Sequence, residues 1–445
     1  MKPGRKITRR GALKMGLAAS AIPALLPVRL FGDDTPSKQI TLGCIGVGWQ
    51  GGSNLGEFLK LKDCRVLAIA DVDQGHLKSA VDRVNGHYQN TDCKGYKDFR
   101  ELLGRSDIDA VCISTPDHWH CITAVEAAKA KKDIFCEKPL SHTLAEGIAM
   151  VEAVKQNERI WQTGSWQRSV ANFRQGTELV INGYIGKVKR VEVGLPSGHA
   201  DFEKTGHDKP NSAPPPDVDY DFWVGPAQMI PFNPCRFHKN WRWCYDFGGG
   251  QLMDWIGHHG DIAHWGLTNP KYGVGPDDQV GPLEVMGKAE FPAAEAVWNT
   301  ATKFRVECKY PNAIELVIAG GYGDIKSGTK WIGEQGWVWV DRGRFETSEP
   351  SWKAEIAQRE KKHDLEMALA ISPGHQREFL DCVKSRKRTL TPVEIAHRSA
   401  TPGHLGYISS VVGRKLTWDA AKQEIIGDAQ ASQLLSRPMR GPWHV

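Results

Sequence analysis

A glycine-rich turn near the start of the chain constrains its fold most. An apolar run over 41–47 leads into Gly46-x-Gly48-x-x-Gly51, and a helical pattern follows from about Ser53. Strand, glycine turn and helix in this order are typical of dinucleotide-binding proteins, because the glycines permit a tight turn, a close diphosphate and close helix packing. We therefore expect a diphosphate on the free N–H groups that begin the helix. The alternative is a structural turn that binds nothing.

A carboxylate follows the next predicted strand. Residues 64–70 are mostly apolar and end at Asp71, about 20 residues after the glycine turn, where an acidic residue binds the ribose hydroxyls of NAD. The same charge repels the 2′-phosphate of NADP. Val72 and Asp73 follow, with no arginine to offset that repulsion. The sequence therefore favours NAD over NADP.

The chain is long enough for two domains, and its pattern changes near residue 163. Before that point strands and helices alternate, which predicts a parallel sheet covered on both faces. We predict strands at 41–47, 64–70, 109–114, 133–136 and 159–163, and helices at 53–61, 74–84, 96–104, 119–131 and 143–156. The fold class is α/β. A Rossmann domain over 38–163 precedes an α/β domain over 164–445, which has a large, mostly antiparallel open sheet and a C-terminal strap.

Three segments lie at predicted strand ends, where ligands of parallel sheets bind. They are Ser114-Thr-Pro-Asp-His-Trp-His120, Cys136-Glu-Lys-Pro139 and Gln162-Thr-Gly-Ser-Trp-Gln-Arg168. With the glycine turn and Asp71, they closely resemble the Gfo/Idh/MocA oxidoreductase family. The resemblance extends over essentially the whole chain after residue 35. It implies that Lys138 lies beside the nicotinamide and the reacting hydroxyl.

Asp254, His258 and Asp261 are spaced i, i+4 and i+7, so one helical face carries them. The resemblance makes His258 the general base and gives Asp254 the role of orienting it or binding the substrate. A lysine in this position helps to remove the carbinol proton or stabilises the alkoxide. A zinc site on Asp254, His258 and His259 is the competing interpretation. No third ligand and no catalytic glutamate at the matching position are evident, so no metal is expected.

The motifs and the insertion supply the remaining predicted site residues. We expect the cofactor to contact Gly46, Gly48, Trp49, Gln50, Gly51, Asp71, Thr115, Pro116, Asp117, His120, Glu137, Lys138 and Gln167. We expect the substrate to contact Arg168, Arg236, Trp241, Arg242, Asp254, His258 and His259. Three of these lie in the insertion, residues 196–247, which is rich in proline and aromatic residues. Its aromatic and basic side chains suit a sugar or polyol, although packing between domains explains them equally well.

The first 35 residues resemble a twin-arginine export signal. Arg9 and Arg10 precede an apolar stretch over 16–26 that is too short to span a bilayer. We therefore expect export to the periplasm without stable membrane insertion, unless an uncleaved signal retains the protein at the membrane. A basic tail is the alternative. Because free NAD is scarce outside the cytoplasm, export implies a tightly bound cofactor.

The composition limits the classes of partner but does not indicate a function. The net charge of +5 is mild and partly belongs to the N-terminal segment, so no nucleic-acid partner is expected. The expected partner is a carbohydrate or polyol, and the resemblance implies a homo-oligomer, a dimer or tetramer. The leading hypothesis is an NAD-dependent oxidoreductase that acts on a sugar, glycoside or polyol carbinol. The alternatives are a redox-type NAD-dependent glycoside hydrolase and a non-catalytic sugar- or nucleotide-binding protein.

Overall fold

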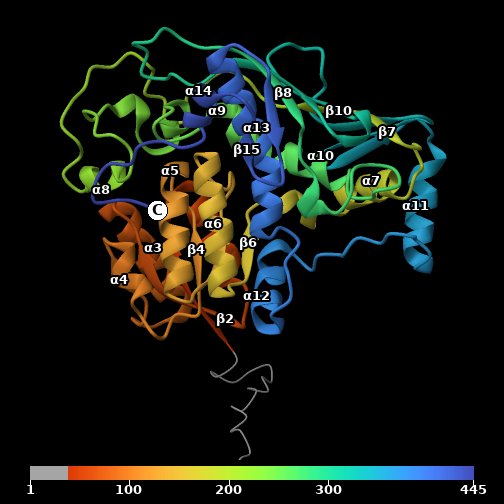
Figure 1. The fold of residues 1–445 in the computed structure, drawn as a ribbon. Helices are drawn as coiled ribbons and strands as arrows, with labels where there is room; N and C mark the ends of the chain where they lie inside the picture. The colour runs from red at the N-terminus through yellow and green to blue at the C-terminus, as the bar shows by residue number, and fades with distance from the viewer. Residues whose placement is uncertain (1–38) are drawn as a thin grey trace, which may run out of the picture. The chain divides into compact units, whose positions relative to one another are not determined.

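The computed structural model describes residues 39–445, in which residues 40–445 form one unit. The predicted export signal over 1–35 lies outside the described residues. Within them, two sheets organise the chain, one near each end of the unit in Figure 1. No helix in the described part is both long and apolar enough to cross a bilayer.

The first sheet has six parallel strands in the order β3-β2-β1-β4-β5-β6. Its strands are β1 (Ile40–Ile45), β2 (Cys64–Ala70), β3 (Lys94–Tyr96), β4 (Ala110–Ile113), β5 (Asp133–Cys136) and β6 (Trp161–Thr163). Its helices are α2 (Trp49–Leu59), α3 (Gln74–Tyr88), α4 (Phe99–Leu103), α5 (Asp117–Lys129) and α6 (Leu144–Asn157). The predicted Rossmann domain is confirmed. Only β3 was missed, because three residues at a sheet edge carry no periodicity.

The apolar strands explain why helices cover this sheet. Every residue of β4 and β5 is buried, as expected for parallel strands packed on both faces. A late helix, α12 (His375–Ser385), returns to this sheet and buries Phe379 beside Phe58 and Phe135. The sequence-based division assigned this helix to the second domain, yet its apolar face packs on the first. In Figure 1 it lies with the helices of the first sheet.

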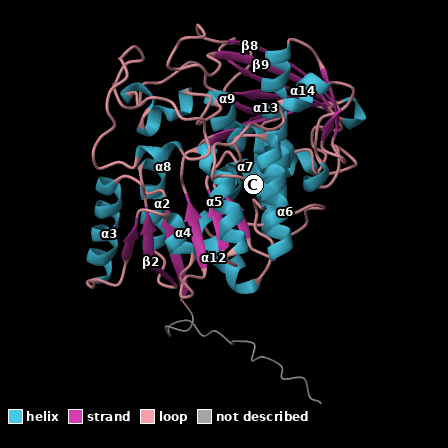
Figure 2. Cartoon of the chain, turned by 60° about the vertical axis from the view of Figure 1, so that its left-hand side comes forward, coloured by secondary structure: helices cyan, strands magenta, loops and turns pink. Residues whose placement is uncertain are grey.

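The second sheet has nine strands in the order β13-β12-β11-β7-β10-β9-β8-β14-β15. Only β7 and β10 pair in parallel, so the predicted mostly antiparallel sheet is confirmed. The strands are β7 (Val188–Gly194), β8 (Glu284–Glu290), β9 (Lys303–Lys309), β10 (Glu315–Gly320), β11 (Gly328–Gly333), β12 (Trp337–Asp341), β13 (Arg344–Thr347), β14 (Leu416–Asp419) and β15 (Glu424–Ile425). Figure 2 shows β8 and β9 at the opposite end from the first sheet.

Helices pack on the second sheet and connect it to the first. They are α7 (Ala171–Ile181), α9 (Gly250–Trp255), α10 (Asp261–Trp265), α11 (Ser351–Lys362), α13 (Val393–Val412) and α14 (Ala429–Gln433), whereas α8 (Tyr220–Val224) packs in the insertion. A π-helical turn, Ile256–Gly260, joins α9 to α10. The predicted helix over 249–265 is therefore present, but it is broken where His258 and His259 lie. Such turns re-aim side chains and are frequent at functional sites.

The insertion builds an apolar core of its own. Trp223, Phe237, Trp243 and Phe247 are buried together with Trp298 from beyond the insertion. The C-terminal strap reaches this region, where Trp443 packs against Trp119 and Phe222. The insertion is thus held on both sides and can position its polar side chains. All ten cysteines lie in the described residues, and they are buried and unpaired.

Candidate active site

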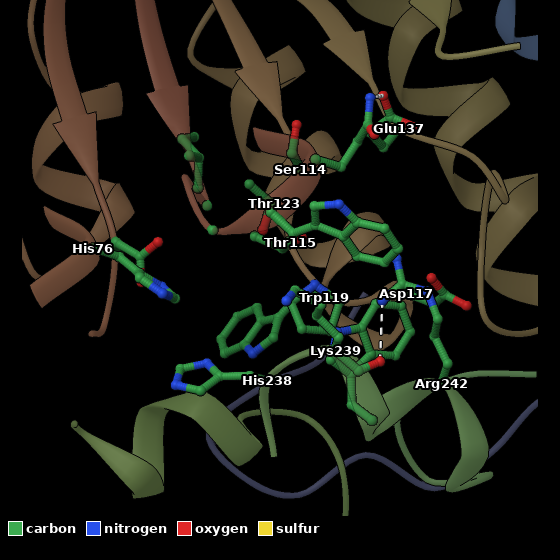
Figure 3. Close-up of a pocket in the computed structure, with 18 of the residues that line it drawn as sticks. His76, Ser114, Thr115, Asp117, Trp119, Thr123, Glu137, His238, Lys239 and Arg242 are labelled. Carbon is green, nitrogen blue, oxygen red and sulfur yellow. Dashed lines mark hydrogen bonds between the residues drawn. The ribbon is translucent and has the colours of Figure 1, made fainter. Parts of the chain in front are cut away.

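One pocket of about 450 Å³ runs from the glycine turn to the broken helix α9–α10. It is lined by fourteen of the predicted site residues: Gly46, Gly48, Trp49, Gln50, Asp71, Thr115, Pro116, Asp117, Glu137, Lys138, Trp241, Arg242, Asp254 and His258. Figure 3 shows several of them converging from the strand ends of the first sheet and from the insertion. The strand ends and the broken helix thus share one cavity.

Two of the three glycines in the turn, Gly46 and Gly51, leave no room for a side chain. Gly46 adopts φ +78°, and a Cβ there would lie 2.9 Å from the backbone of Ser114. A Cβ on Gly51 would lie 2.0 Å from the carbonyl oxygen of Gly46. Helix α2 begins at Trp49, earlier than the predicted start near Ser53, so its free N–H groups border the pocket. This cradle fits a diphosphate, since both close backbone approach and helix-terminal donors are present.

Asp71 lies where a ribose-binding carboxylate is expected. Its oxygens accept hydrogen bonds from the backbone N–H of Val47, at 2.8 Å, and of Asp73, at 2.9 Å. Burial raises the pKa of Asp71, and these two bonds oppose the increase. The bonds also hold the carboxylate at the pocket wall. The first domain therefore carries both anchoring groups that a dinucleotide requires.

Lys138 and Asp254 meet at the other end of the pocket. The Lys138 ammonium donates to Asp254 Oδ1 at 2.9 Å and to the Asp254 carbonyl oxygen at 3.0 Å. Arg242 Nε lies 3.4 Å from the same Oδ1. Burial alone would raise the pKa of Asp254, but Lys138 and Arg242 outweigh it and hold that pKa well below its usual range. A Cβ on Gly257 would lie 2.8 Å from Lys138 Cβ, so this glycine permits the approach.

His258 lies on the π-helical turn and borders the same cavity. It is 5% exposed, and its Nδ1 has no hydrogen-bond partner among the described residues. Burial lowers the pKa of His258 well below its usual value, and Lys138 and Arg342 lower it further. The imidazole is therefore neutral at physiological pH. A neutral imidazole has one unprotonated ring nitrogen, which can accept a proton.

Asp117 faces the Lys138–Asp254 pair from the start of α5. Burial and the neighbouring Asp254 carboxylate raise the pKa of Asp117 to about 8, although Arg242 and Lys138 oppose this. Two carboxyl groups thus take opposite protonation states at pH 7. Asp117 carries a proton that it can donate, and Asp254 is ionised.

The structure places other predicted residues outside the pocket. Arg168 is 2% exposed, and it binds Asp261 at 2.7 Å and Asp277 at 2.5 Å. These ion pairs occupy its guanidinium and turn Asp261 away from the site, which helical spacing could not reveal. Arg236 donates to Asn211 and to the carbonyl oxygen of Pro231. The structure therefore does not bring Arg168 or Arg236 to the substrate region.

His259, Gln167, Gly51 and His120 do not line the pocket either. His259 is buried and stacks on Trp255, with ring centroids 5.8 Å apart. Gln167 is 1% exposed, and Gly51 lies behind the glycine turn. His120 contacts the carbonyl oxygens of Pro139 and Thr115, so it positions two strand-end segments. Burial lowers the pKa of His120 to about 4, although both contacts favour imidazolium.

Several lining residues were not predicted as site residues: His76, Trp119, Trp166, Phe222, Trp255 and Arg342. Trp166 and Trp255 adjoin predicted residues and could have been found from that proximity. Arg342 lies on the turn between β12 and β13, where no motif marked it. His76 and His238 lie close together at one side of the pocket in Figure 3, with ring centroids 4.9 Å apart.

Comparison with known proteins agrees with this geometry. Residues 40–165 match a family model described as the oxidoreductase family, NAD-binding Rossmann fold. Residues 167–445 match the model for the C-terminal alpha/beta domain of the same oxidoreductase family. Together the two models account for both sheets.

Among curated proteins, myo-inositol 2-dehydrogenase of Thermotoga maritima is 35% identical over 146 residues, which is 33% of this chain and 42% of that protein. A glycosyl hydrolase family 109 protein of Shewanella baltica is 33% identical over 127 residues, or 27% of each chain. The matched stretches thus span less than half the length of these relatives.

Solved structures resemble the chain over much more of its length. A WlbA dehydrogenase from Bordetella pertussis, in complex with NADH and UDP-GlcNAcA, aligns with a TM-score of 0.62 at 17% identity, covering 86% of this chain and 98% of that one. An aldose-aldose oxidoreductase from Caulobacter crescentus aligns with a TM-score of 0.59 at 16% identity, covering 85% and 99%. These similarities show the fold. Because the two family models together cover both domains, the chain belongs to the Gfo/Idh/MocA oxidoreductase family.

Proposed function

We propose that the protein is an NAD-dependent oxidoreductase that transfers hydride between a sugar, glycoside or polyol carbinol and a tightly bound nicotinamide cofactor. One observation carries the proposal. The Lys138–Asp254 pair and the imidazole of His258 border the same pocket as the glycine turn. Proton-handling groups are therefore within one cavity with a dinucleotide cradle. The inositol and aldose oxidoreductases named above are consistent with such a substrate.

The residues divide the chemistry between them. Bound NAD would supply the hydride acceptor. Lys138 hydrogen-bonds the carbinol oxygen and stabilises the negative charge that develops as the C–H bond breaks. The carbinol proton passes to the imidazole of His258, which is neutral and borders the pocket. Asp254 holds the Lys138 ammonium in place, and Arg242 holds Asp254.

Two acidic side chains support NAD rather than NADP. Asp71 and Asp73 both line the pocket at the ribose end of the cradle. The N–H bonds to Asp71 keep its carboxylate aimed at that region. A 2′-phosphate there would meet two like charges. We expect NADP to bind more weakly than NAD for this reason.

The insertion supports slow cofactor release, because its side chains contact residues at both ends of the pocket. Trp49 of the glycine turn packs on Phe202, with ring centroids 5.3 Å apart, and under the Arg242 guanidinium at 5.0 Å. His238 lies 3.4 Å from Asp73. The cofactor would leave only after these contacts open.

Two measurements test the function. Denatured protein should release NAD, detected by mass spectrometry. In a screen of sugars, glycosides and polyols, at least one compound should reduce the bound cofactor and produce the absorbance of reduced nicotinamide. Absence of a dinucleotide would contradict the tightly bound cofactor. Release of an aryl aglycone without added NAD or net reduction would instead support the glycoside hydrolase, which the family 109 relative makes the second candidate.

Export and assembly are part of the same proposal. The twin-arginine segment Arg9-Arg10 supports a periplasmic location. Cell fractionation should find the protein in the periplasm, and replacement of both arginines by lysine should retain it in the cytoplasm. An open second sheet suits a homo-oligomer, a dimer or tetramer. Light scattering of the purified protein would contradict this if it gave the mass of one chain.

A further inference from the structure

Arg342 is a cation of the pocket whose guanidinium is not paired. It lies on the turn between β12 and β13, where its backbone N–H donates to Asp341 Oδ1 at 2.7 Å. Within residues 39–445, its guanidinium has no carboxylate within 4 Å and no side-chain hydrogen bond. The neighbouring Asp341 carboxylate is directed to that backbone N–H, to Ser327 at 3.3 Å and to His259 at 3.5 Å. Arg342 therefore keeps its donor edges free.

The turn that carries Arg342 is held in place. The side-chain amide of Asn172, on α7, donates to the carbonyl oxygens of Asp341 at 2.8 Å and Arg344 at 3.0 Å. Gly343 adopts φ +77°, which suits a tight turn between two strands. The backbone of Arg342 is thus fixed from both sides. Only its side chain needs to order when a ligand binds.

Two indole rings hold the guanidinium over the substrate region. Its Cζ lies 5.0 Å from the centroid of Trp166 and 4.6 Å from that of Trp255. Such stacking uses the flat faces of the guanidinium and leaves its N–H edge available for a planar anion. The Trp255 ring is in turn 5.5 Å from the His258 ring. Arg342 and His258 therefore both contact the Trp255 ring, and both line the pocket.

The charge of this end of the pocket is positive. Lys138, Arg242 and Arg342 are cations that line it. Asp254 is ionised, and Glu137 lies beside Lys138 with a pKa that burial raises. Asp117 is protonated at pH 7 because its pKa is raised to about 8, so the three cations outnumber the carboxylates even if Glu137 is ionised. His258 is neutral. An anionic group on the substrate would offset this excess, whereas a neutral polyol would leave it unmatched.

We propose that the substrate carries an anionic group, a carboxylate or a phosphate monoester, and that Arg342 binds it while the carbinol lies at Lys138 and His258. This rests on the proposed function and narrows its substrate class. Arg342 forms a bidentate pair with the anion. Trp166 and Trp255 orient the guanidinium, and they shield the pair from water. Arg342 thereby determines specificity and stands apart from the proton-transfer groups.

The test measures binding separately from turnover. Quenching of tryptophan fluorescence is titrated with matched hexoses: glucose, glucuronate and glucose 6-phosphate, and galactose with galacturonate. At least one anionic probe should bind tenfold or more tightly than its neutral counterpart. If a uronate binds more tightly than glucose 6-phosphate, the anion is a carboxylate. If glucose 6-phosphate binds more tightly, it is a phosphate monoester. Arg342→Gln should weaken anion binding at least tenfold and leave the neutral sugars unchanged.

Two variants serve as controls. Arg344→Gln removes the next arginine of the same turn, which packs over Trp339 outside the pocket, and should bind like the wild type. Arg342→Lys keeps the charge without the planar fork and should give an intermediate loss. Equal binding of charged and neutral sugars, no binding of any anionic probe, or an unchanged Arg342→Gln overturns the inference. Anion binding that depends on Arg342 without any cofactor reduction would instead uphold it and contradict the oxidoreductase.

Discussion

The two ends of the pocket are built differently. The cofactor end takes most of its residues from strand ends of one parallel sheet, within residues 46–137. The substrate end combines Trp166, Arg242, the turn around His258 and Arg342, which lie far apart in the chain. Local motifs therefore describe the first end. Only the folded chain shows the second.

Two arginines illustrate the difference. Arg168 follows a recognisable strand-end segment, yet it is 2% exposed between Asp261 and Asp277. Arg342 follows no motif, yet its guanidinium is unpaired and lines the pocket. Residue type and position near a motif thus do not show whether a charge is available. The ion-pair partners of the arginine show whether its charge is available, and those partners are distant in sequence.

The largest effect is expected from Lys138→Ala, which tests the substrate end alone. Loss of a group that stabilises the alkoxide should lower kcat by about 10²–10⁴-fold. The cofactor should remain bound, because the glycine turn and Asp71 are untouched. Single-turnover reduction of bound NAD measures the loss of turnover, and mass analysis of released NAD measures how much cofactor stays bound.

The matched control is Lys155→Ala, which removes an exposed lysine on α6. It should leave both quantities unchanged. Unaltered turnover in Lys138→Ala would refute the catalytic role given to this lysine. Loss of NAD together with turnover would show that the two ends are not separable, and would weaken the contrast drawn between them.

The fold and the cofactor end were largely predictable from sequence, for physical reasons. Glycines that must turn or be approached closely, and apolar strands that end in polar residues, leave a pattern within a few residues. The hydrogen-bond and ion-pair partners that a side chain meets in the folded protein leave no such pattern in the sequence. Asp254 and His258 were predicted from helical spacing and resemblance, but the π-helical turn between them and the capture of Asp261 by Arg168 arise from tertiary packing.

Gly51→Ala tests the cofactor end, with the second-largest effect. Its Cβ would meet the Gly46 carbonyl oxygen at 2.0 Å, so the turn must open. We expect a loss of about 1–3 kcal/mol in the free energy of unfolding, and loss of bound NAD. Urea titration and mass analysis measure these two outcomes.

Gly86→Ala is the matched control, because nothing lies within 4 Å of its added Cβ in helix α3. It should stabilise the protein by about 0.4–1 kcal/mol, since alanine favours the helix. If Gly51→Ala also retained stability and NAD, the close packing that we assign to the turn would not be essential, and local sequence would constrain this end less than we infer.

His375 joins the two domains and gives a pH dependence of intermediate size. It contacts the Thr163 carbonyl oxygen and the Ser169 hydroxyl, each at 2.9 Å, and burial lowers its pKa to about 4. The unfolded chain, with a pKa near 6.5, binds more protons between these values. The stability due to neutral His375 is therefore complete above pH 6.5 and is lost as the pH falls towards 4.

Replacing His375 by glutamine removes this titration. The slope of the unfolding free energy against pH between 4.5 and 6 should flatten by up to about 1.4 kcal/mol per pH unit. Urea denaturation across that range measures it. A variant with the wild-type slope would show that His375 is not held neutral. The junction between the two domains would then contribute less than either end of the pocket to acid sensitivity.

The smallest effect is expected where the two ends meet, at Trp49. Its indole belongs to the glycine turn but packs on Phe202 and Arg242, which belong to the insertion. The residue is 51% exposed, so aromatic and cation–π contacts rather than burial hold it, at about 0.5–1 kcal/mol. Trp49→Ala should therefore release reduced cofactor about two- to fivefold faster, measured by loss of its fluorescence in excess unlabelled competitor. Trp49→Phe keeps an aromatic face and should stay close to the wild type. If alanine and phenylalanine behaved alike, the insertion would not close the pocket through this ring, and retention of NAD would depend on the first domain alone.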